Sequence, residues 1–155
     1  MSLSLSKIGS IAVRGVIRFF FKRHLVEKMC FILARLYLRK FRPKIVAITG
    51  SAGKTSTKEA IYLALKRSFS VRASAKSYNN EIGVPLTIFG FRSPARSLLG
   101  WLILLFRALW RQCFSKRYPK VLVLEMGADK PGDLAYLTRL AKPDISVITR
   151  IGPAH

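Results

Sequence analysis

A lysine and a threonine follow a small-residue turn at residues 50–55, and this spacing could hold a phosphate. An apolar, β-branched run at residues 46–49 leads into the turn, and a helical pattern follows it. Gly50 and Gly53 let the backbone bend tightly and bring its N–H groups close to phosphate oxygens. The N-terminus of the following helix points unpaired N–H groups and its positive dipole end at the same anion. The pattern therefore predicts a phosphate-binding loop.

Two side chains of this turn have defined roles in such a loop. Lys54 would reach the β- and γ-phosphates, and the hydroxyl of Thr55 would take a place on Mg²⁺. Ile48 stands where the longer G-x-x-x-x-G-K-[ST] pattern has its first glycine, so the motif has a shorter form. The alternative is a glycine/serine turn with a chance lysine. The predicted ATP-binding residues are Gly50, Ser51, Ala52, Gly53, Lys54, Thr55 and Ser56.

A carboxylate ends a second apolar run, at residues 121–125. If this run is a buried strand, Glu125 lies at its carboxyl end, where open α/β sheets bind their ligands. A carboxylate at that position suits Mg²⁺. The alternative is a strand-end carboxylate in contact with water.

The elements that must position these side chains alternate along the chain. We expect strands at residues 44–49, 69–72, 121–125 and 144–149, and helices at 55–67, 81–89 and 129–141. Asp129 would cap the last helix and Pro131 would lie in its first turn. Apolar strands that alternate with helices predict an α/β fold of the P-loop NTPase type, a parallel sheet with helices on both faces.

Composition limits the class of protein and its partners. The 155 residues suit a single domain with a real core, and 28 Lys plus Arg against 7 acidic residues give a net charge of +21. Such a charge implies an anionic partner. Cys30 and Cys113 have no metal-ligand spacing, which predicts buried or interfacial thiols in a reducing compartment.

Residues 1–43 form a basic leader in which Glu27 is the single acidic residue. Apolar and basic positions alternate at helical spacing over residues 8–41, but basic residues interrupt the apolar run too often for a secretory signal or a membrane span. An amphipathic helix on an anionic membrane surface is one interpretation. A helix packed on the domain, with a solvated basic face, is the other.

A second apolar helix is expected at residues 98–110, within an insertion around 93–117. Trp101 and Trp110 would suit a membrane interface, and a core or interdomain helix is the equal alternative. Nucleic acid is not an expected partner, because the basic residues lie among aliphatic side chains and no stacking platform or binding motif accompanies them.

Four ordered motifs carry a resemblance to a known family. They are 50–58 (GSAGKTSTK), 78–87 (YNNEIGVPLT), 124–129 (LEMGAD) and 148–155 (ITRIGPAH). Together they resemble the Mur ligase family over about residues 44–155, and most of all its branch that adds a D-alanyl-D-alanine dipeptide. The resemblance implies an ATP-binding central domain, of which this chain holds the N-terminal part. It also implies an enzyme of peptidoglycan precursor synthesis that joins D-Ala-D-Ala to a UDP-MurNAc-peptide through an acyl phosphate.

The resemblance also implies site residues and cofactors. Lys54, Glu125 and His155 are the implied catalytic residues, with ATP and Mg²⁺ as cofactors. Thr55 and Glu125 would hold one metal ion near ATP, and Glu125 and His155 a second one near the acyl phosphate. Asn79 and Asn80 would border the substrate, although asparagines are also ordinary loop or helix-cap residues.

Departures from the family pattern set further expectations. The basic leader stands where the family has its uridine-nucleotide domain, and Arg150 replaces a small or amide residue. The chain stops at His155, so we expect a fragment that needs the family's C-terminal domains and ligates nothing alone. We expect it in the cytoplasm, at the inner membrane surface. A membrane-bound nucleotide-binding module and a ligase of the related folylpolyglutamate or cyanophycin type stay as alternatives.

Overall fold

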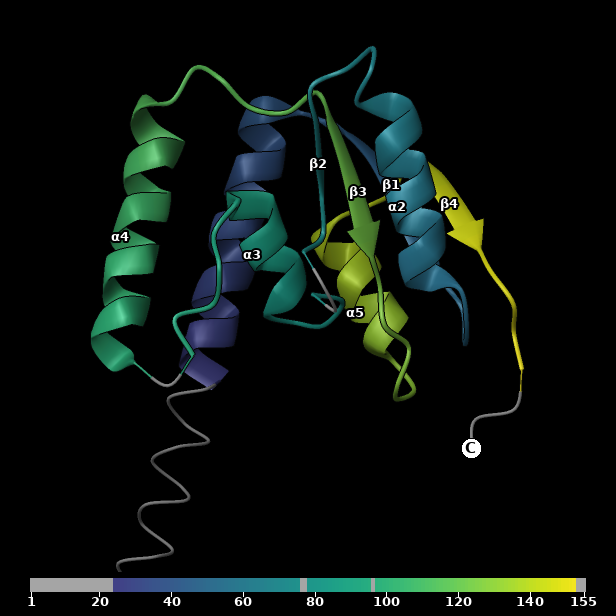
Figure 1. Cartoon of the computed structure of the whole chain (residues 1–155). Helices are drawn as coiled ribbons and strands as arrows, with labels where there is room; N and C mark the ends of the chain where they lie inside the picture. The colour runs from purple at the N-terminus through teal and green to yellow at the C-terminus, as the bar shows by residue number, and fades with distance from the viewer. Residues whose placement is uncertain (1–23, 76–77, 96, 153–155) are drawn as a thin grey trace, which may run out of the picture.

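The computed structural model describes residues 24–75, 78–95 and 97–152, which form a four-stranded sheet covered by helices (Figure 1). The strands are β1 (Lys44–Thr49), β2 (Val71–Ala73), β3 (Val121–Glu125) and β4 (Ile145–Ile148). The helices are α2 (Lys54–Leu65), α3 (Gly83–Phe89), α4 (Leu98–Phe114) and α5 (Asp133–Leu140), preceded by an N-terminal helix that covers residues 24–41. The strand order is β2-β3-β1-β4, with every pairing parallel. The predicted α/β class is therefore confirmed.

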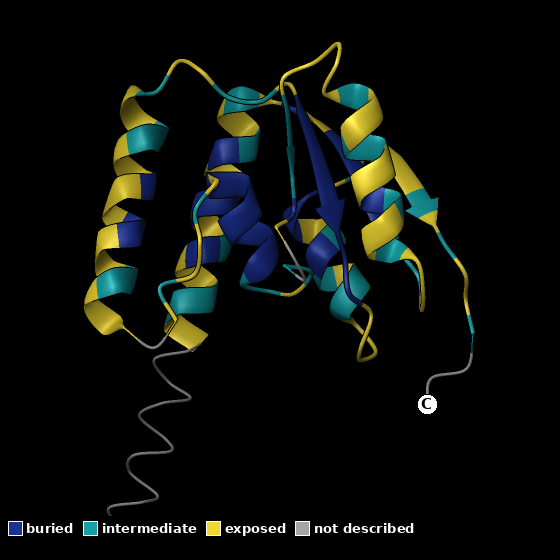
Figure 2. Cartoon of the chain, viewed as in Figure 1, coloured by how far each residue is buried: buried dark blue, intermediate teal, exposed yellow. Residues whose placement is uncertain are grey.

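Alternate residues of the central strand divide the core between the two faces of the sheet. Ile45 and Ala47 join a cluster with the N-terminal helix, α3, α4 and α5, whereas Val46 and Ile48 pack on the side of α2. Side chains alternate in this way because successive residues of a strand point to opposite faces. Both faces of β1 and β3 are buried (Figure 2), which explains their continuous apolar sequence.

Pairing of the strands brings their carboxyl ends together. Ile48 of β1 is opposite Glu125 of β3, and Thr49 is opposite Ile148 of β4. The turn at residues 50–53 and the Glu125 side chain consequently share one edge of the sheet. This is the edge that the sequence predicts for ligand chemistry.

The bounds of β1 and β3 match the expected 44–49 and 121–125, but α5 begins later than predicted. Its N-cap is Gly132, with φ 97°, so the expectation that Asp129 caps this helix is wrong. A left-handed residue breaks helical geometry, and residues 129–132 therefore form a separate turn. Asp133 closes that turn by accepting a 2.8 Å hydrogen bond from the Lys130 amide.

The N-terminal helix packs on the domain, as one of the two interpretations of the leader requires. Cys30, Ala34 and Tyr37 of this helix are buried in the larger core cluster, and the Tyr37 hydroxyl donates a 2.7 Å hydrogen bond to the Ala108 carbonyl of α4. Cys30 is buried as predicted. Cys113 is exposed, so it is not a buried thiol, and an interfacial position for it stays a prediction.

The apolar insertion forms α4, which lies outside the layer made by the N-terminal helix and α3 (Figure 1). Leu104, Leu105 and Ala108 of α4 are buried, while most of its other apolar side chains are exposed. None of the helices within the described residues has the length and apolar content needed to cross a bilayer. At the opposite end of the sheet, β4 is an edge strand whose residues Ile145 and Ile148 are exposed.

Candidate nucleotide site

The loop between β1 and α2 depends on two glycines with positive φ. Gly50 has φ 138° and Gly53 has φ 82°, values that side-chain-bearing residues rarely adopt. A Cβ atom at Gly50 would also collide with the Thr149 hydroxyl and lie 3.1 Å from the Arg150 carbonyl oxygen. Glycine at position 50 is therefore required both by conformation and by space.

The segment that follows β4 holds the loop in place. The Thr149 hydroxyl lies 3.0 Å from the Thr49 carbonyl oxygen and 2.7 Å from the Ala52 carbonyl oxygen, and both can accept from it. The Ser51 amide donates a 2.8 Å hydrogen bond to the Arg150 carbonyl oxygen. In this conformation the hydrogen bond of the Ser51 amide stabilises the loop. The first turn of α2, which has no side-chain cap and no acidic residue, is the place where an anion would meet amide donors.

Lys54 lies over the loop that precedes it. Its Nζ is 2.6 Å from the Gly50 carbonyl oxygen and 3.3 Å from the Ser51 carbonyl oxygen. The ammonium group is consequently held at the mouth of the turn, where the sequence predicts that a phosphate binds. When a phosphate binds, the Lys54 ammonium would exchange its contacts with these two carbonyl oxygens for contacts with phosphate oxygens.

Thr55 and Glu125 meet at the carboxyl edge of the sheet. The Thr55 hydroxyl donates a 3.0 Å hydrogen bond to Glu125 Oε2. Glu125 is only 2% exposed, so the interpretation of this residue as a solvated strand-end carboxylate is wrong. The Glu125 amide donates a 3.1 Å hydrogen bond to the Ser74 hydroxyl, which fixes the strand end next to this pair.

Lys58 is a site residue that sequence reasoning missed. It is fully buried, and its Nζ lies 3.9 Å from Glu125 Oε2 and 3.2 Å from Glu59 Oε1. A buried lysine needs such partners, because an uncompensated charge in the interior is costly. Its spacing was the available signal: Lys58 follows Thr55 by three residues and Lys54 by four, which places all three on one face of α2.

The Thr55–Glu125 pair has the chemistry of a magnesium site that is completed by a nucleotide. A hydroxyl and a carboxylate oxygen lie within 3.0 Å of each other, and Mg²⁺ in such sites takes one or two protein oxygens together with phosphate oxygens. No group of three or more His, Cys, Asp or Glu side chains that could hold a metal ion occurs in the part of the chain that the structure describes. The hydroxyl of Thr55 and the carboxylate of Glu125 therefore fit a Mg²⁺ ion whose other ligands include phosphate oxygens.

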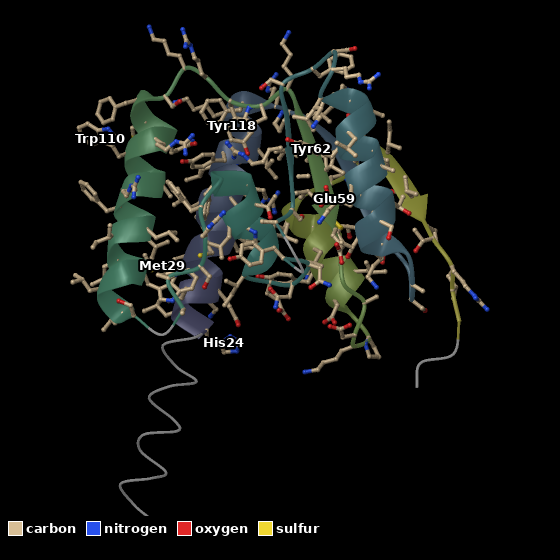
Figure 3. All side chains as sticks on the ribbon, viewed as in Figure 1. His24, Met29, Glu59, Tyr62, Trp110 and Tyr118 are labelled. Atoms are coloured by element: carbon tan, nitrogen blue, oxygen red, sulfur yellow. The ribbon has the colours of Figure 1, made fainter. Side chains whose placement is uncertain are left out.

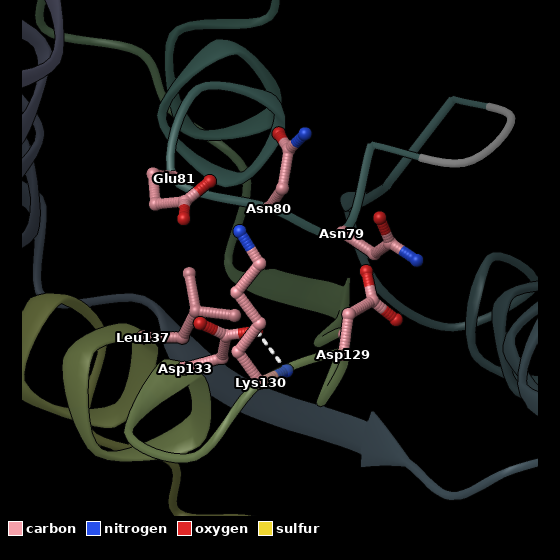
Figure 4. Close-up of a pocket in the computed structure, with 8 residues that line it drawn as sticks. Asn79, Asn80, Glu81, Asp129, Lys130, Asp133 and Leu137 are labelled. Atoms are coloured by element: carbon pink, nitrogen blue, oxygen red, sulfur yellow. Dashed lines mark hydrogen bonds between the residues drawn. The ribbon is translucent and has the colours of Figure 1, made fainter. Parts of the chain in front are cut away.

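Asn79 and Asn80 line a cavity of about 190 Å³ beside the carboxyl edge (Figure 4). The Asn79 carbonyl oxygen accepts a 2.7 Å hydrogen bond from the Gly127 amide, and Asn80 Oδ1 accepts from the Gly83 amide at 2.8 Å. Asn80 therefore closes the turn that leads into α3. The remaining lining residues are Glu81, Gly127, Asp129, Lys130, Asp133 and Leu137.

Two further site expectations have different outcomes. His155 lies outside the residues that the structure describes. Arg150 forms an isolated antiparallel bridge with Ala52 through its backbone, while its side chain is exposed. The backbone of Arg150 thus supports the loop whatever its side chain contacts.

A parallel sheet, a glycine turn before a helix and a hydrogen bond from Thr55 of that helix to the buried Glu125 at the end of β3 define an α/β domain of the P-loop type. Residues 48–98 match the model of the Mur ligase middle domain. The chain belongs to the Mur ligase family, as its four sequence motifs predict.

Curated relatives give the branch that this chain resembles. It is 33% identical over 123 residues to the UDP-N-acetylmuramoyl-tripeptide–D-alanyl-D-alanine ligase of Bacillus subtilis, covering 79% of this chain and 22% of the relative. It is 35% identical over 111 residues to the protein of the same name from Mycobacterium leprae, covering 72% of this chain and 17% of the relative.

Solved structures of such ligases share the fold. The MurF ligase of Thermotoga maritima in complex with ADP superposes with a TM-score of 0.62 at 35% identity, over 83% of this chain and 25% of that one. A MurF structure from Acinetobacter baumannii gives a TM-score of 0.60 at 26% identity, over 81% and 23%. The chain therefore spans about a quarter or less of the length of these proteins.

Proposed function

We propose that this chain is the ATP-binding part of a ligase that joins D-Ala-D-Ala to a UDP-MurNAc-peptide through an acyl-phosphate intermediate. The contact between Thr55 and Glu125 beside the loop carries the proposal, because it pairs a hydroxyl with a buried carboxylate next to a phosphate-binding turn. The names of its relatives and the ADP held by the similar Thermotoga maritima ligase support the same function.

The proposed chemistry needs two things from these residues. A carboxylate becomes a useful electrophile only after phosphorylation, so the γ-phosphate must be held, neutralised and aligned with the attacking oxygen. Lys54 and the amides at the start of α2 would hold and neutralise it. Thr55 and Glu125 would hold Mg²⁺, which supplies further charge neutralisation when bound. An amine then attacks the acyl carbon and phosphate leaves.

The remaining site residues have proposed roles beside the nucleotide. Asn79 and Asn80 would border the peptide substrate from the cavity that they line. Glu125 and His155 would hold a second metal ion near the acyl phosphate. The exposed side chain of Arg150 is available to a phosphate at the mouth of the loop.

Two alternatives differ in what accompanies nucleotide binding. Ligases of the folylpolyglutamate and cyanophycin type would use the same loop with other substrates. A nucleotide-binding module at an anionic membrane would bind ATP without ligation. An anionic membrane is a second partner that we propose, because the N-terminal helix and α4 expose apolar side chains as well as basic ones.

Calorimetric titration with ATP and Mg²⁺ tests the nucleotide site. Lys54→Ala should abolish detectable binding while circular dichroism shows an unchanged fold, because the ammonium would contact the β/γ-phosphates. Lys66→Ala is the matched control, since Lys66 is an exposed lysine that ends the same helix. Unchanged ATP affinity in Lys54→Ala would refute the assignment of the loop.

The ligase activity is tested on the product of the native gene. Its intact mass, compared with 17.5 kDa for these 155 residues, shows which polypeptide to assay. Phosphate release from ATP should require both D-Ala-D-Ala and UDP-MurNAc-tripeptide. Release with glutamate in place of the dipeptide would favour a related ligase, and nucleotide binding without any release would favour the module.

A further inference from the structure

Two neighbouring helices, the N-terminal helix and α4, carry exposed apolar residues. Figure 2 shows the exposed positions along α4. In the N-terminal helix these residues recur at spacings of three or four, which places them on one side of the helix. They are Leu25, Met29, Ile32 and Leu36, each at least 40% exposed. In α4 the exposed residues are Leu98, Leu99, Leu102, Ile103, Phe106, Leu109, Trp110 and Phe114.

The two helices lie side by side, so their apolar faces adjoin. Gln112 of α4 donates a 3.1 Å hydrogen bond to the Leu36 carbonyl oxygen, and Lys40 reaches the Gln112 carbonyl oxygen from the N-terminal helix. Leu36 is itself a member of the exposed stripe, and Trp110, close to Gln112 in α4, points away from the rest of the molecule (Figure 3). We call this combined apolar face the outer helix surface.

Charge around the outer helix surface has one sign. Basic residues that are exposed on the two helices or just after α4 are Lys28, Arg35, Arg39, Lys40, Arg107, Lys116 and Arg117. The described part of these helices contains a single acidic residue, Glu27, which contacts His24 at 3.1 Å. By contrast, Glu125 lies at the carboxyl edge of the sheet, Asp129 in the turn beyond it and Asp133 at the start of α5.

We infer that the outer helix surface docks on an anionic phospholipid bilayer, with both helices lying in the membrane interface. Apolar residues would enter the acyl boundary while lysine and arginine reach the headgroups, and Trp110 suits the interface between them. A second copy of the chain would meet the same basic residues, which repel one another. Anionic headgroups complement them.

Such docking leaves the candidate nucleotide site accessible. The outer helix surface lies at one end of the molecule, whereas α2 and β4, which flank the loop, lie at the other (Figure 1). The membrane proposal therefore does not depend on the ligase proposal. A chain that does not bind membranes could therefore still bind ATP.

Vesicle flotation of the complete 155-residue chain tests the inference, with phosphatidylcholine vesicles that either contain or lack phosphatidylglycerol. The wild-type chain should float with the anionic vesicles. The double variant L99Q/F106Q should lose about tenfold or more of this binding, because two apolar side chains no longer enter the bilayer. Leu63→Gln is the control and should float like the wild type, since Leu63 is also an exposed leucine but lies on α2.

A second pair of variants tests the charge. R39Q/K116Q should weaken binding and reduce its salt dependence, whereas Arg67→Gln, which removes an exposed charge near α2, should change it less. Circular dichroism and ATP titration should be unchanged in L99Q/F106Q, which separates a lost surface from a lost fold.

Three results would overturn the inference. The wild-type chain could fail to float, L99Q/F106Q could float as well as the wild type, or Leu63→Gln could lose binding to the same extent. Sedimentation that shows a concentration-dependent dimer, absent in L99Q/F106Q, together with no vesicle binding, would assign the surface to a second copy instead.

Discussion

The Thr55 hydroxyl donates a 3.0 Å hydrogen bond to Glu125 across 70 positions of sequence, and it joins the phosphate-binding turn to the end of the neighbouring strand. Parallel pairing of β1 with β3 makes this contact possible, because it brings both carboxyl ends to one edge. The same carboxylate lies 3.9 Å from the buried Lys58. Glu125 thus links a hydroxyl that could bind a metal ion to an interior cation.

Removing the Thr55 hydroxyl should weaken the dependence of ATP binding on Mg²⁺. For Thr55→Val we expect the free energy of ATP binding in the presence of Mg²⁺ to weaken by about 2 kcal/mol, roughly thirtyfold in affinity. The reason is that the removed hydroxyl makes its contact with a charged group. Titration with and without Mg²⁺ measures the difference, and Thr57→Val in the same helical turn is the control. An undiminished effect of Mg²⁺ in Thr55→Val would contradict the assignment of this hydroxyl to the metal.

A side chain at Gly50 should destabilise the loop through two separate effects. Gly50→Ala combines a positive φ with a collision against the Thr149 hydroxyl, whereas Gly132→Ala has a positive φ but no atom within 4 Å of the added Cβ. Gly132→Ala should therefore cost only about 1–2 kcal/mol of unfolding free energy, and Gly50→Ala clearly more. Urea unfolding measures both.

Relief of the collision provides the internal check. Adding Thr149→Ala to Gly50→Ala removes the opposing oxygen, so the double variant should lose less stability than the two single effects combined. Strict additivity would show that the Thr149 contact does not limit position 50.

The two cysteines should differ in reactivity. Burial, with a smaller effect of nearby Glu27, raises the pKa of the Cys30 thiol to about 12, so at neutral pH it is protonated as well as inaccessible. Iodoacetamide at neutral pH should label the folded chain at Cys113, which is exposed. Mass spectrometry should find no label on folded Cys113→Ser, and a label on Cys30 only after urea is added. Equal labelling of both thiols in the folded chain would contradict the burial of the N-terminal helix.

The contacts of Asp144 with the start of β1 should make the free energy of unfolding depend on pH in the acid range. Asp144 accepts hydrogen bonds from the Lys44 ammonium and the Ile45 amide, each at 2.8 Å, and these lower the pKa of its carboxyl group. A lowered pKa means that this stabilisation is fully present above the unfolded value, about 4. It is lost as the pH falls through the lower folded value.

Asp144→Asn should therefore lower the free energy of unfolding at neutral pH. Below about pH 4 the wild type loses this stabilisation as well, so the free energies of unfolding of the two proteins should differ less. Urea unfolding of Asp144→Asn and the wild type across this range measures the change. A constant difference between Asp144→Asn and wild type at every pH would show that the carboxylate charge is not the cause.

Local chemistry was enough to predict the elements that carry several residues of the candidate site. The glycines at 50 and 53, Lys54 and Thr55 follow an apolar run that becomes β1, with the expected bounds. Glu125 ends β3 as predicted. Asp129 shows where such reasoning fails, because an acidic residue before Pro131 suits a helix start, yet the left-handed Gly132 delays α5. The outcome depended on a backbone angle that composition does not specify.

The sequence by itself determined the strands, the turn and the order of the motifs, since these follow from apolar runs, glycine conformation and spacing along the chain. Only the tertiary structure decided which distant groups meet: Thr149 against the loop, Lys58 beside Glu125, and the N-terminal helix beside α4. The physical reason is the register of the parallel strands and the packing of whole faces. Both place residues about 70–100 positions apart within hydrogen-bonding distance, and no local pattern encodes such pairs.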